Sequence, residues 1–231
     1  MDGNGRWAQL RGRPRTFGHI KGARVAKKVI SACAEMGIEN LTLYAFSTEN
    51  WLRPEQEVAF LMRLLGRYLK RETENLLAEN IRFSVIGNVA SLPKEMRTVV
   101  QDTISATQHC TGMRLIFALS YGSRQEIVAT TKALALKVQN GELEVSDIDE
   151  SLFSMNLSTH PAPDLDLMIR TSGEQRVSNF LLWQSAYSEL YFTRTLWPDF
   201  NRTELEQIFA YFLSRERRFG QVTEQYEQPS H

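Results

Sequence analysis

The chain has 231 residues, with 42% hydrophobic and 23% charged residues and equal numbers of basic and acidic side chains, 27 each. This length fits one α/β domain that buries a large core without disulfides or a structural metal. A formal net charge of +0 argues against a general nucleic-acid binder, which carries a basic excess. No apolar run reaches about 18 residues, so no membrane span is predicted.

Cys33 and Cys110 lie in apolar helical patterns and form no C-x-x-C pair. We therefore expect two buried, reduced thiols, with a disulfide as the second interpretation. The first residues are polar and glycine-rich, unlike a signal peptide. Together these features predict a cytoplasmic protein, with peripheral attachment to a membrane as an open alternative.

Helix-period and strand-like segments alternate along the chain. We expect a loop over 1–18, where glycines and Pro14 act as breakers, and polar loops over 47–53 and 170–178. Residues 1–220 form one domain, and the tail 221–231, rich in Gln and Glu, is predicted to be disordered. The expected helices are 19–36, 54–79, 93–108, 123–139, 149–157 and 203–215, and the expected strands are 41–46, 82–86, 114–119, 165–169 and 190–192.

Strands that are separated by helices predict a mostly parallel sheet flanked by helices on both faces. In such sheets ligands bind beyond the carboxyl ends of the strands. The loops that follow the strands are therefore the places where chemistry is expected.

Three polar loops combine arginine with glycine or small hydroxyl residues, and two of them follow predicted strands. Glycine lets the backbone approach a ligand closely, N–H groups in such turns bind anions, and the guanidinium group matches phosphate oxygens. One such arginine is usually a solvated surface charge, but three loops together predict a site for one or two polyanionic groups. The loops are Asp2–Trp7 with Arg13, Arg15 and His19 following, then Ser47–Arg53, then Arg170–Asn179.

Asp2 and Glu189 are the candidate metal carboxylates. Magnesium that binds a diphosphate takes only one or two protein carboxylates and keeps several waters. From the residues alone the alternatives stay open: Asp2 could be a turn residue, Glu189 a surface or capping residue, and His19 a helix-capping or core histidine. The sequence has no zinc spacing of His and Cys, no G-x-S-x-G and no P-loop.

The predicted helix 54–79 is apolar on more than one face. A helix of this kind is buried on two sides or lines a cavity. Phe60 and Leu64 lie away from the main stripe and are the candidates for lining an apolar cavity, while Trp7 and Trp51 either wall the anion site or simply pack. The main stripe is Val58, Leu61, Met62, Leu65, Leu69 and Leu76.

These segments together resemble the cis-prenyltransferases of the undecaprenyl diphosphate synthase type. The resemblance covers nearly the whole chain in order, and motifs of this length and number are specific. The matching segments are D-G-N-G-R-W at 2–7, R-x-F-G-H at 15–19, L-T-L-Y-A-F-S-T-E-N-W at 41–51, Y-G-S-R at 121–124, R-T-S-G-E-Q-R-V-S-N-F-L-L-W-Q at 170–184, E-L-Y-F at 189–192, L-W-P-D-F at 196–200 and R-E-R-R-F-G at 215–220.

The resemblance implies a single α/β domain with a six-stranded, mainly parallel sheet and an apolar tunnel, assembled as a homodimer. It implies Mg²⁺-dependent condensation of isopentenyl diphosphate onto an allylic diphosphate, with farnesyl diphosphate the expected primer. The product would be a long polyprenyl diphosphate such as undecaprenyl diphosphate, a membrane-bound carrier of cell-wall sugars. No nucleic-acid partner is implied.

The resemblance also implies roles for individual residues. Asp2 would coordinate magnesium, with Glu189 as a second ligand, and Asn50 would accept a proton. Arg218 and Gly220 would reach a site of the partner subunit. The allylic diphosphate would be bound by Gly3, Asn4, Gly5, Arg6, Arg15 and His19, the isopentenyl diphosphate by Arg170, Arg176 and Ser178, and the reaction centre would be shaped by Ser47, Glu49, Asn50, Trp51 and Arg53, with Trp7, Thr48 and Val177 as further substrate-binding candidates.

Two departures from the family pattern matter. Gln175 stands where some members carry a histidine that is thought to assist the metal, and an amide lacks that proton chemistry. Members also carry an apolar strand before D-G-N-G-R, so we expect the natural protein to extend upstream.

Two other functions stay open: a catalytically silent subunit of the same fold, which should lack the D-G-N-G-R loop, and an unrelated α/β phosphate-ester enzyme, which would need no tunnel.

Overall fold

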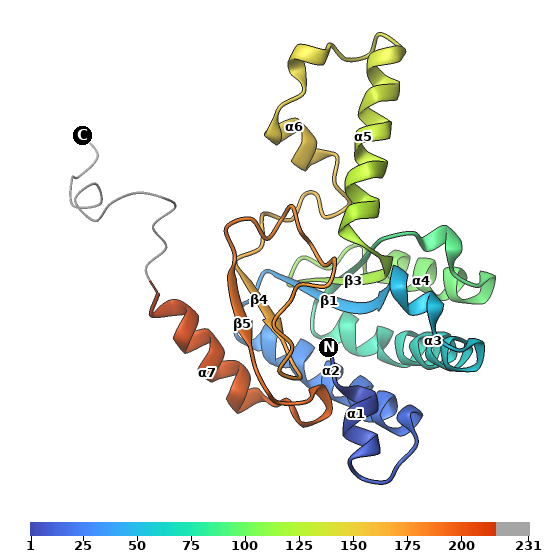
Figure 1. Cartoon of the computed structure of the whole chain (residues 1–231), viewed down its shortest axis with the longest axis vertical. Helices are drawn as coiled ribbons and strands as arrows, with labels where there is room; N and C mark the ends of the chain where they lie inside the picture. The colour runs from blue at the N-terminus through green and yellow to red at the C-terminus, as the bar shows by residue number, and fades with distance from the viewer. Residues whose placement is uncertain (216–231) are drawn as a thin grey trace.

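The computed structural model describes residues 1–215, whose strands form two parallel sheets (Figure 1). The first sheet has the order β1-β3-β2, with β1 at Asn40–Ser47, β2 at Arg82–Ile86 and β3 at Arg114–Tyr121. In the second, β4 (Leu167–Arg170) pairs with β5 (Glu189–Phe192). The parallel α/β architecture and all the predicted strands are confirmed, but within 1–215 the strands form a three-stranded and a two-stranded sheet rather than one sheet of six.

The predicted helices are also present, with small shifts at their ends. Residues 47–53, predicted as a loop, include a 3-10 helix at Thr48–Leu52. The α-helices are α1 (Asn4–Gln9), α2 (Arg15–Glu35), α3 (Glu55–Ala78), α4 (Lys94–Thr107), α5 (Ser123–Gln139), α6 (Glu150–Met155) and α7 (Arg202–Leu213).

The prediction of a loop over 1–18 is wrong. This segment contains α1 and the first turn of α2. Gly3, with φ of 100°, is the N-cap residue of α1, and Pro14 is the N-cap residue of α2. Glycine tolerates this left-handed conformation, and proline is compatible with a helix start. Gly3 and Pro14 therefore mark helix boundaries, whereas Gly5 and Gly18 lie inside α1 and α2.

Strand β3 separates two apolar layers. Leu115, Phe117 and Leu119 belong to a core formed with helices α2, α3, α4 and α7. Ile116 and Ala118 point to the opposite face, where they pack with Met168 of β4 and with Leu181. A strand that is buried on both faces is nearly continuously apolar, as β3 is. The second cluster also connects the two sheets through shared packing.

Cys33 and Cys110 are both buried free thiols, as predicted. Burial raises the pKa of Cys33 to about 12, so this thiol stays protonated.

Within residues 1–215, no helix is both long enough and apolar enough to cross a membrane.

An ion pair between the half-exposed Lys27 and the buried Glu72 connects α2 to α3. The Glu72 side chain is only 3% exposed, and its Oε2 lies 2.7 Å from Lys27 Nζ. Arg71 and Asn75 also donate hydrogen bonds to this carboxylate. Burial opposes ionisation of Glu72, but the hydrogen bonds from Lys27, Arg71 and Asn75 outweigh it and hold the pKa of the carboxyl group below its ordinary value.

Lys27→Met should reduce the free energy of unfolding by about 1.5–3 kcal/mol, because it removes a charged hydrogen-bond donor from a buried carboxylate. Urea unfolding at neutral pH measures the change. Lys28→Met is the control, since Lys28 is exposed and makes no ion pair with the described residues. Equal losses in the two variants would contradict a specific role for the ion pair.

Candidate functional site

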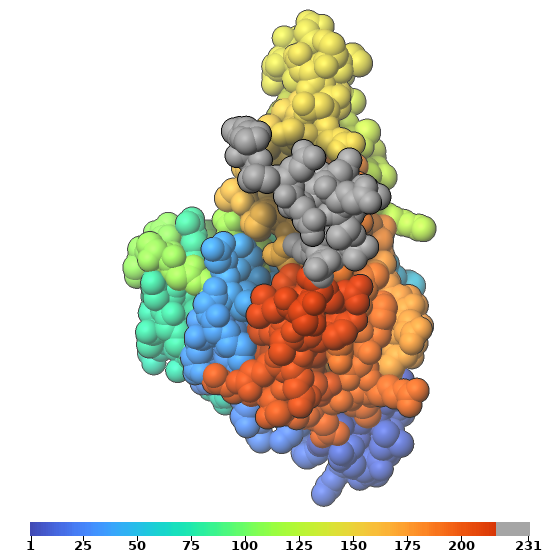
Figure 2. Space-filling model, turned by 90° about the vertical axis from the view of Figure 1, so that its left-hand side faces the viewer, coloured from blue at the N-terminus to red at the C-terminus, as the bar shows by residue number. Residues whose placement is uncertain are grey.

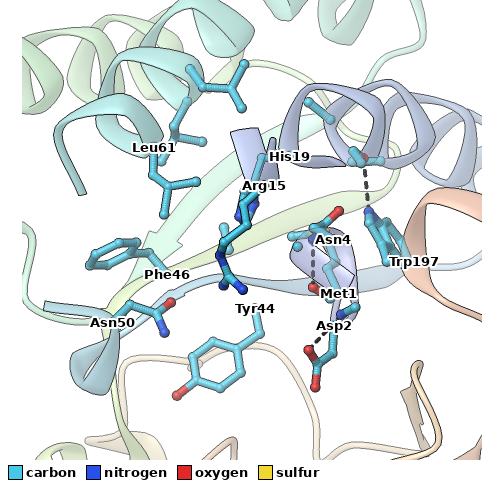
Figure 3. A pocket seen from close by; sticks show the side chains of 18 of the residues that line it. Met1, Asp2, Asn4, Arg15, His19, Tyr44, Phe46, Asn50, Leu61 and Trp197 are labelled. Carbon is cyan, nitrogen blue, oxygen red and sulfur yellow. Dashed lines mark hydrogen bonds between the residues drawn. The ribbon is translucent and has the colours of Figure 1, made fainter. Parts of the chain in front are cut away.

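A pocket of about 250 Å³ lies where the carboxyl end of β1 meets the N-terminal segment (Figure 3). Its polar end contains Asp2, Asn4, Arg15, His19 and Asn50, and its other end is apolar. The side chain of Arg15 extends into the middle of the pocket, with Asn50 on one side and Asn4 on the other (Figure 3). The structure therefore brings together residues from the first and second predicted loops.

Close packing of α1 on α2 forms one wall of this pocket. A Cβ atom at Gly18 would lie 1.9 Å from the Asn4 carbonyl oxygen, and one at Gly22 would lie 2.0 Å from Asn4 Oδ1. Contacts below 3.0 Å are not sustained by real Cβ atoms, so only glycine permits this approach. The two glycines are one helical turn apart and form a flat face on which Asn4 sits.

The N-terminal segment is also bound to the end of β4. The backbone N–H of Asp2 donates to Thr171 Oγ1 at 2.9 Å, and the Thr171 hydroxyl donates to the Asp2 carbonyl oxygen at 2.9 Å. Arg170 donates to Asp2 Oδ2 at 3.1 Å, and the N–H of Gly3 donates to Asp2 Oδ1 at 2.7 Å. Burial opposes ionisation of Asp2, but the bonds from Arg170 and Gly3 outweigh it and hold the pKa of this carboxyl group below its ordinary value.

The third predicted loop surrounds the guanidinium group of Arg170. This group donates to Ser178 Oγ at 2.7 Å and to the carbonyl oxygen of Arg176. Arg176 itself pairs with Glu174, which also lies 3.3 Å from Arg6. Arg6 further donates to Ser172 Oγ at 2.8 Å. The first and third predicted loops are therefore in direct contact.

The second predicted loop faces the third across a polar bridge. Asn179 donates to Glu49 Oε1 at 3.0 Å. Burial opposes ionisation of Glu49, but the hydrogen bond from Asn179 contributes to a pKa below the ordinary value for this carboxyl group. Asn50 Oδ1 accepts a hydrogen bond from the backbone N–H of Ser47 at 3.1 Å. This bond fixes the turn after β1.

Glu57 of α3 holds three basic side chains at the pocket. Its carboxylate lies 3.2 Å from Arg53, 3.5 Å from Arg15 and 3.8 Å from His19. Glu57 was not among the residues selected from the sequence. Its position in the first turn of α3, four residues after Arg53, was the available signal, since Arg53 directly precedes the N-cap residue Pro54.

His19 is neutral at physiological pH. Burial lowers its pKa to about 4, and Arg53 and Arg15 add to this effect, while Glu57 acts in the opposite direction. A neutral imidazole offers one donor and one acceptor nitrogen. His19 can therefore donate a hydrogen bond to an anion without adding a charge.

Several buried polar atoms around the site have no hydrogen-bond partner among the described residues. They are Asn4 Oδ1, His19 Nε2, Thr48 Oγ1 and Arg170 Nε. Buried polar atoms are almost always paired in folded proteins. Asn4 and His19 line the pocket, and the nitrogens His19 Nε2 and Arg170 Nε are atoms that can donate to a negatively charged ligand, whereas Asn4 Oδ1 can only accept.

The apolar end of the pocket is formed by one face of α3. Leu61, Leu64, Leu65 and Tyr68 line it, and Phe117 of β3 lies against Tyr68 in a stacked arrangement at 6.3 Å. Leu64 lines the pocket as predicted. Phe60 is not among the lining residues, and Leu61 and Leu65, which were assigned to the core stripe, are. The prediction for Phe60 is therefore wrong, because the lining face runs from Leu64 into the core stripe, including Met62, and Phe60 lies on the far side of Leu64.

Some candidate residues lie away from the pocket. Trp7 is 7% exposed and donates to Asp199 at 2.6 Å, and Trp51 donates to Ser120 at 2.8 Å, so both pack behind the site. Val177 packs in the second apolar cluster. Glu189 begins β5, and its carboxylate pairs with Arg215 at 2.9 Å. Arg218, Gly220 and the tail 221–231 lie outside the described residues.

Glu189 and Asp2 are not adjacent within this chain. In the β4–β5 register Glu189 pairs with Leu167, whereas Arg170, which holds Asp2, pairs with Phe192. Three residues along a strand correspond to about 10 Å. No group of three or more His, Cys, Asp or Glu side chains within residues 1–215 could hold a metal ion.

The fold and pocket define an α/β protein with a polar, arginine-containing pocket beside an apolar cavity. The family described as "Putative undecaprenyl diphosphate synthase" matches residues 1–220. The chain belongs to this family of prenyltransferases.

Curated relatives and a solved structure agree with this assignment. The chain is 48% identical over 225 residues to the isoprenyl transferase of Chlorobaculum tepidum, covering 97% of this chain and 85% of that protein. It is 49% identical over 227 residues to the (2E,6E)-farnesyl-diphosphate-specific ditrans,polycis-undecaprenyl-diphosphate synthase of Lactiplantibacillus plantarum, covering 97% and 88%. Lavandulyl diphosphate synthase from Lavandula x intermedia, solved with dimethylallyl diphosphate, matches with a TM-score of 0.94 and 38% identity, covering 96% and 95%.

The burial of His19 predicts a pH-dependent stability. Its folded pKa of about 4 lies below the ordinary 6.5, so between these values the unfolded chain binds more protons. The contribution of His19 is therefore fully present above pH 6.5 and is lost as the pH falls towards 4. His19→Gln should flatten the unfolding free energy across this range in urea titrations. The exposed His109, replaced by Gln, is the control, and an identical slope in wild type and His19→Gln would contradict the assignment.

Proposed function

We propose that this chain condenses isopentenyl diphosphate onto an allylic diphosphate, with farnesyl diphosphate as the primer, to give a long polyprenyl diphosphate of cis geometry. The observation that carries the proposal is the pocket itself, in which unpaired buried polar atoms and Arg15 lie at one end and the apolar face of α3 lies at the other. This arrangement fits an allylic diphosphate, with its charged head and apolar tail. An undecaprenyl product would serve as the carrier of cell-wall sugars.

The chemistry follows from the charges around the pocket. The allylic C–O bond breaks and releases diphosphate, the double bond of isopentenyl diphosphate forms the new C–C bond, and one proton leaves the condensed product. Arg15, Asn4 and neutral His19 would bind the departing diphosphate, because donors fixed in advance stabilise charge that develops in the transition state. Arg170, with Ser178 and Arg176, would bind the second diphosphate. Asn50, at the same pocket, would orient the isopentenyl group and assist in proton removal.

The residues present fit a magnesium ion that is held mainly by a diphosphate. Asp2 offers an ionised carboxylate at the polar end of the pocket, with its side chain 41% exposed. Such an ion takes only one or two protein carboxylates. When bound it would neutralise charge on the leaving diphosphate. Asp2 would hold it in this chain, while Glu189 would contribute only if an assembly brought it to the site.

A homodimer is part of this proposal. Helices α5 and α6 form an arm that projects away from the sheets (Figure 1). The arm exposes large apolar side chains that a second copy of the chain would cover. These are Val128, Leu136, Val145, Ile148 and Met155, with exposures of 38% to 69%. A location in the cytoplasm is likewise proposed.

A silent subunit is less well supported than a catalytic one. The D-G-N-G-R loop is present, and it lines the pocket with Asp2, Asn4 and Arg6. The family assignment also excludes an unrelated phosphate-ester enzyme. One measurement distinguishes the two remaining possibilities: a catalytic chain incorporates labelled isopentenyl diphosphate into product, and a silent subunit does not.

The purified chain with Mg²⁺, farnesyl diphosphate and radiolabelled isopentenyl diphosphate should form a labelled, extractable polyprenyl product. Asp2→Asn should lower turnover by at least roughly a hundredfold, because it removes the carboxylate that holds the metal. Asp102→Asn on the exposed face of α4 is the matched control. Absence of product from a folded wild-type chain would refute the catalytic proposal, and near-full activity of Asp2→Asn would refute the role of Asp2.

The lining face of α3 should set the length of the product. Leu64→Trp should shorten the chains without abolishing the first condensation, because a bulky side chain fills the apolar end. Tyr68→Ala should lengthen them, because it removes a ring that lines that end and so enlarges it. Phe60→Trp is the control, since Phe60 does not line the pocket. Reversed-phase chromatography at matched turnover gives the distribution, and unchanged lengths in both folded variants would exclude this face as the tunnel wall.

A further inference from the structure

Positive charge is concentrated at the N-terminal end of a chain whose net charge is zero. Residues 3–34 contain no Asp or Glu, although Asp and Glu number 27 in the whole chain. The basic residues of this segment are Arg6, Arg11, Arg13, Arg15, Lys21, Arg24, Lys27 and Lys28. Such an imbalance within one structural unit creates a local field that the net charge conceals.

Part of this charge is neutralised inside the fold, but part is not. Arg11 pairs with Asp199, Lys27 with Glu72 and Arg15 with Glu57. Arg13, Lys21, Arg24 and Lys28 are exposed and make no ion pair with any described residue. These four side chains therefore present their charge to the solvent.

Three of the four unpaired charges lie on one face of α2, and Arg13 precedes the helix. Phe17, Lys21, Arg24 and Lys28 follow the spacing of four, three and four residues that places side chains on one face of an α-helix. All four are exposed. We call this set the basic face of α2. It extends over about 16 Å, from the spacing of 1.5 Å per residue.

Apolar side chains adjoin the basic face at the turn between α1 and α2. Leu10 is 76% exposed and Phe17 is 44% exposed. Arg13 lies over the Phe17 ring, with its guanidinium carbon 5.7 Å from the ring centroid. An exposed apolar tip beside a row of lysine and arginine residues is typical of segments that lie on a membrane surface.

The apolar tip lies at one end of the molecule. Helix α1 and the start of α2 form the lower end in both views (Figures 1 and 2). The same helix α2 carries Arg15 and His19, which line the pocket. A surface that contacts the tip would therefore lie close to the pocket.

We propose that the basic face of α2 and the apolar tip at Leu10 dock this protein onto an anionic lipid bilayer. Lysine and arginine side chains are attracted to acidic headgroups within about 8 Å at physiological salt. Leu10 and Phe17 enter the boundary between headgroups and acyl chains. Docking places the pocket beside the phase in which a long apolar product is soluble. The inference goes beyond the proposed reaction, and its test does not require turnover.

The test measures binding of the full chain to vesicles by co-sedimentation. Wild-type protein should bind vesicles of phosphatidylcholine with phosphatidylglycerol, bind neutral phosphatidylcholine vesicles far less, and dissociate as salt is raised. The triple variant Lys21→Gln, Arg24→Gln, Lys28→Gln should bind anionic vesicles at least about tenfold more weakly. Leu10→Gln should weaken binding while the dependence on salt remains.

A matched control removes the same charge elsewhere. Lys94, Arg97 and Lys132 are exposed residues on α4 and α5. Their triple replacement by Gln should leave vesicle binding within about twofold of wild type, since the contact requires charges on one face. Thermal melts verify that all variants fold.

Three outcomes would overturn the proposal: no binding of wild type to anionic vesicles, equal binding to neutral and anionic vesicles, or equal losses in the α2 and control triples. A fourth result would give the basic face of α2 a different role. If the α2 triple leaves vesicle binding intact but lowers kcat/KM for soluble diphosphates in a salt-dependent way, the basic face attracts substrate and does not dock on lipid.

Discussion

The approach of α1 to the glycine face of α2 is the constraint on which the site depends. With Gly18 and Gly22 beneath it, Asn4 lies within contact distance of the α2 backbone. That contact fixes the first loop relative to Arg15 and His19, which α2 itself carries. The hydrogen bonds of Asp2 with Thr171 and Arg170 then fix the same loop to the end of β4. One short segment thereby aligns groups from distant parts of the chain.

The arginines around the pocket are arranged by carboxylates as well as by the backbone. Glu57 spaces Arg15 and Arg53, and Asp2 orients Arg170. Without these carboxylates the cations would repel one another in a partly buried space, where charges interact more strongly than in water. As a consequence, some guanidinium N–H donors bind these carboxylates and are not available to a ligand. The unpaired nitrogens His19 Nε2 and Arg170 Nε show that the site is still not saturated by its own residues.

Helix α3 shows where prediction from the sequence fails. Its apolar character on more than one face indicated two kinds of surroundings, which the structure confirms. The pattern did not divide the faces correctly, because helical residues such as Leu61 and Leu65 differ by only about 40° about the axis, and Leu61 and Leu64 by about 60°. Only the position of Phe117 and of α2 decides which of them meets a cavity. Glycine and proline before α1 and α2 were similarly ambiguous, since they begin helices as readily as they interrupt them.

The sequence by itself determined the order of strands and of the helices after α1, the parallel α/β class and the three polar, arginine-bearing loops, because these follow from local periodicity and from residue chemistry. It also determined the family through motifs in order along the chain. Only the tertiary structure decided that Glu57 joins the site, that Trp7 and Trp51 pack behind it, and that Glu189 lies apart from Asp2. Those facts depend on distances between residues far apart in the sequence, which packing sets and local patterns do not encode.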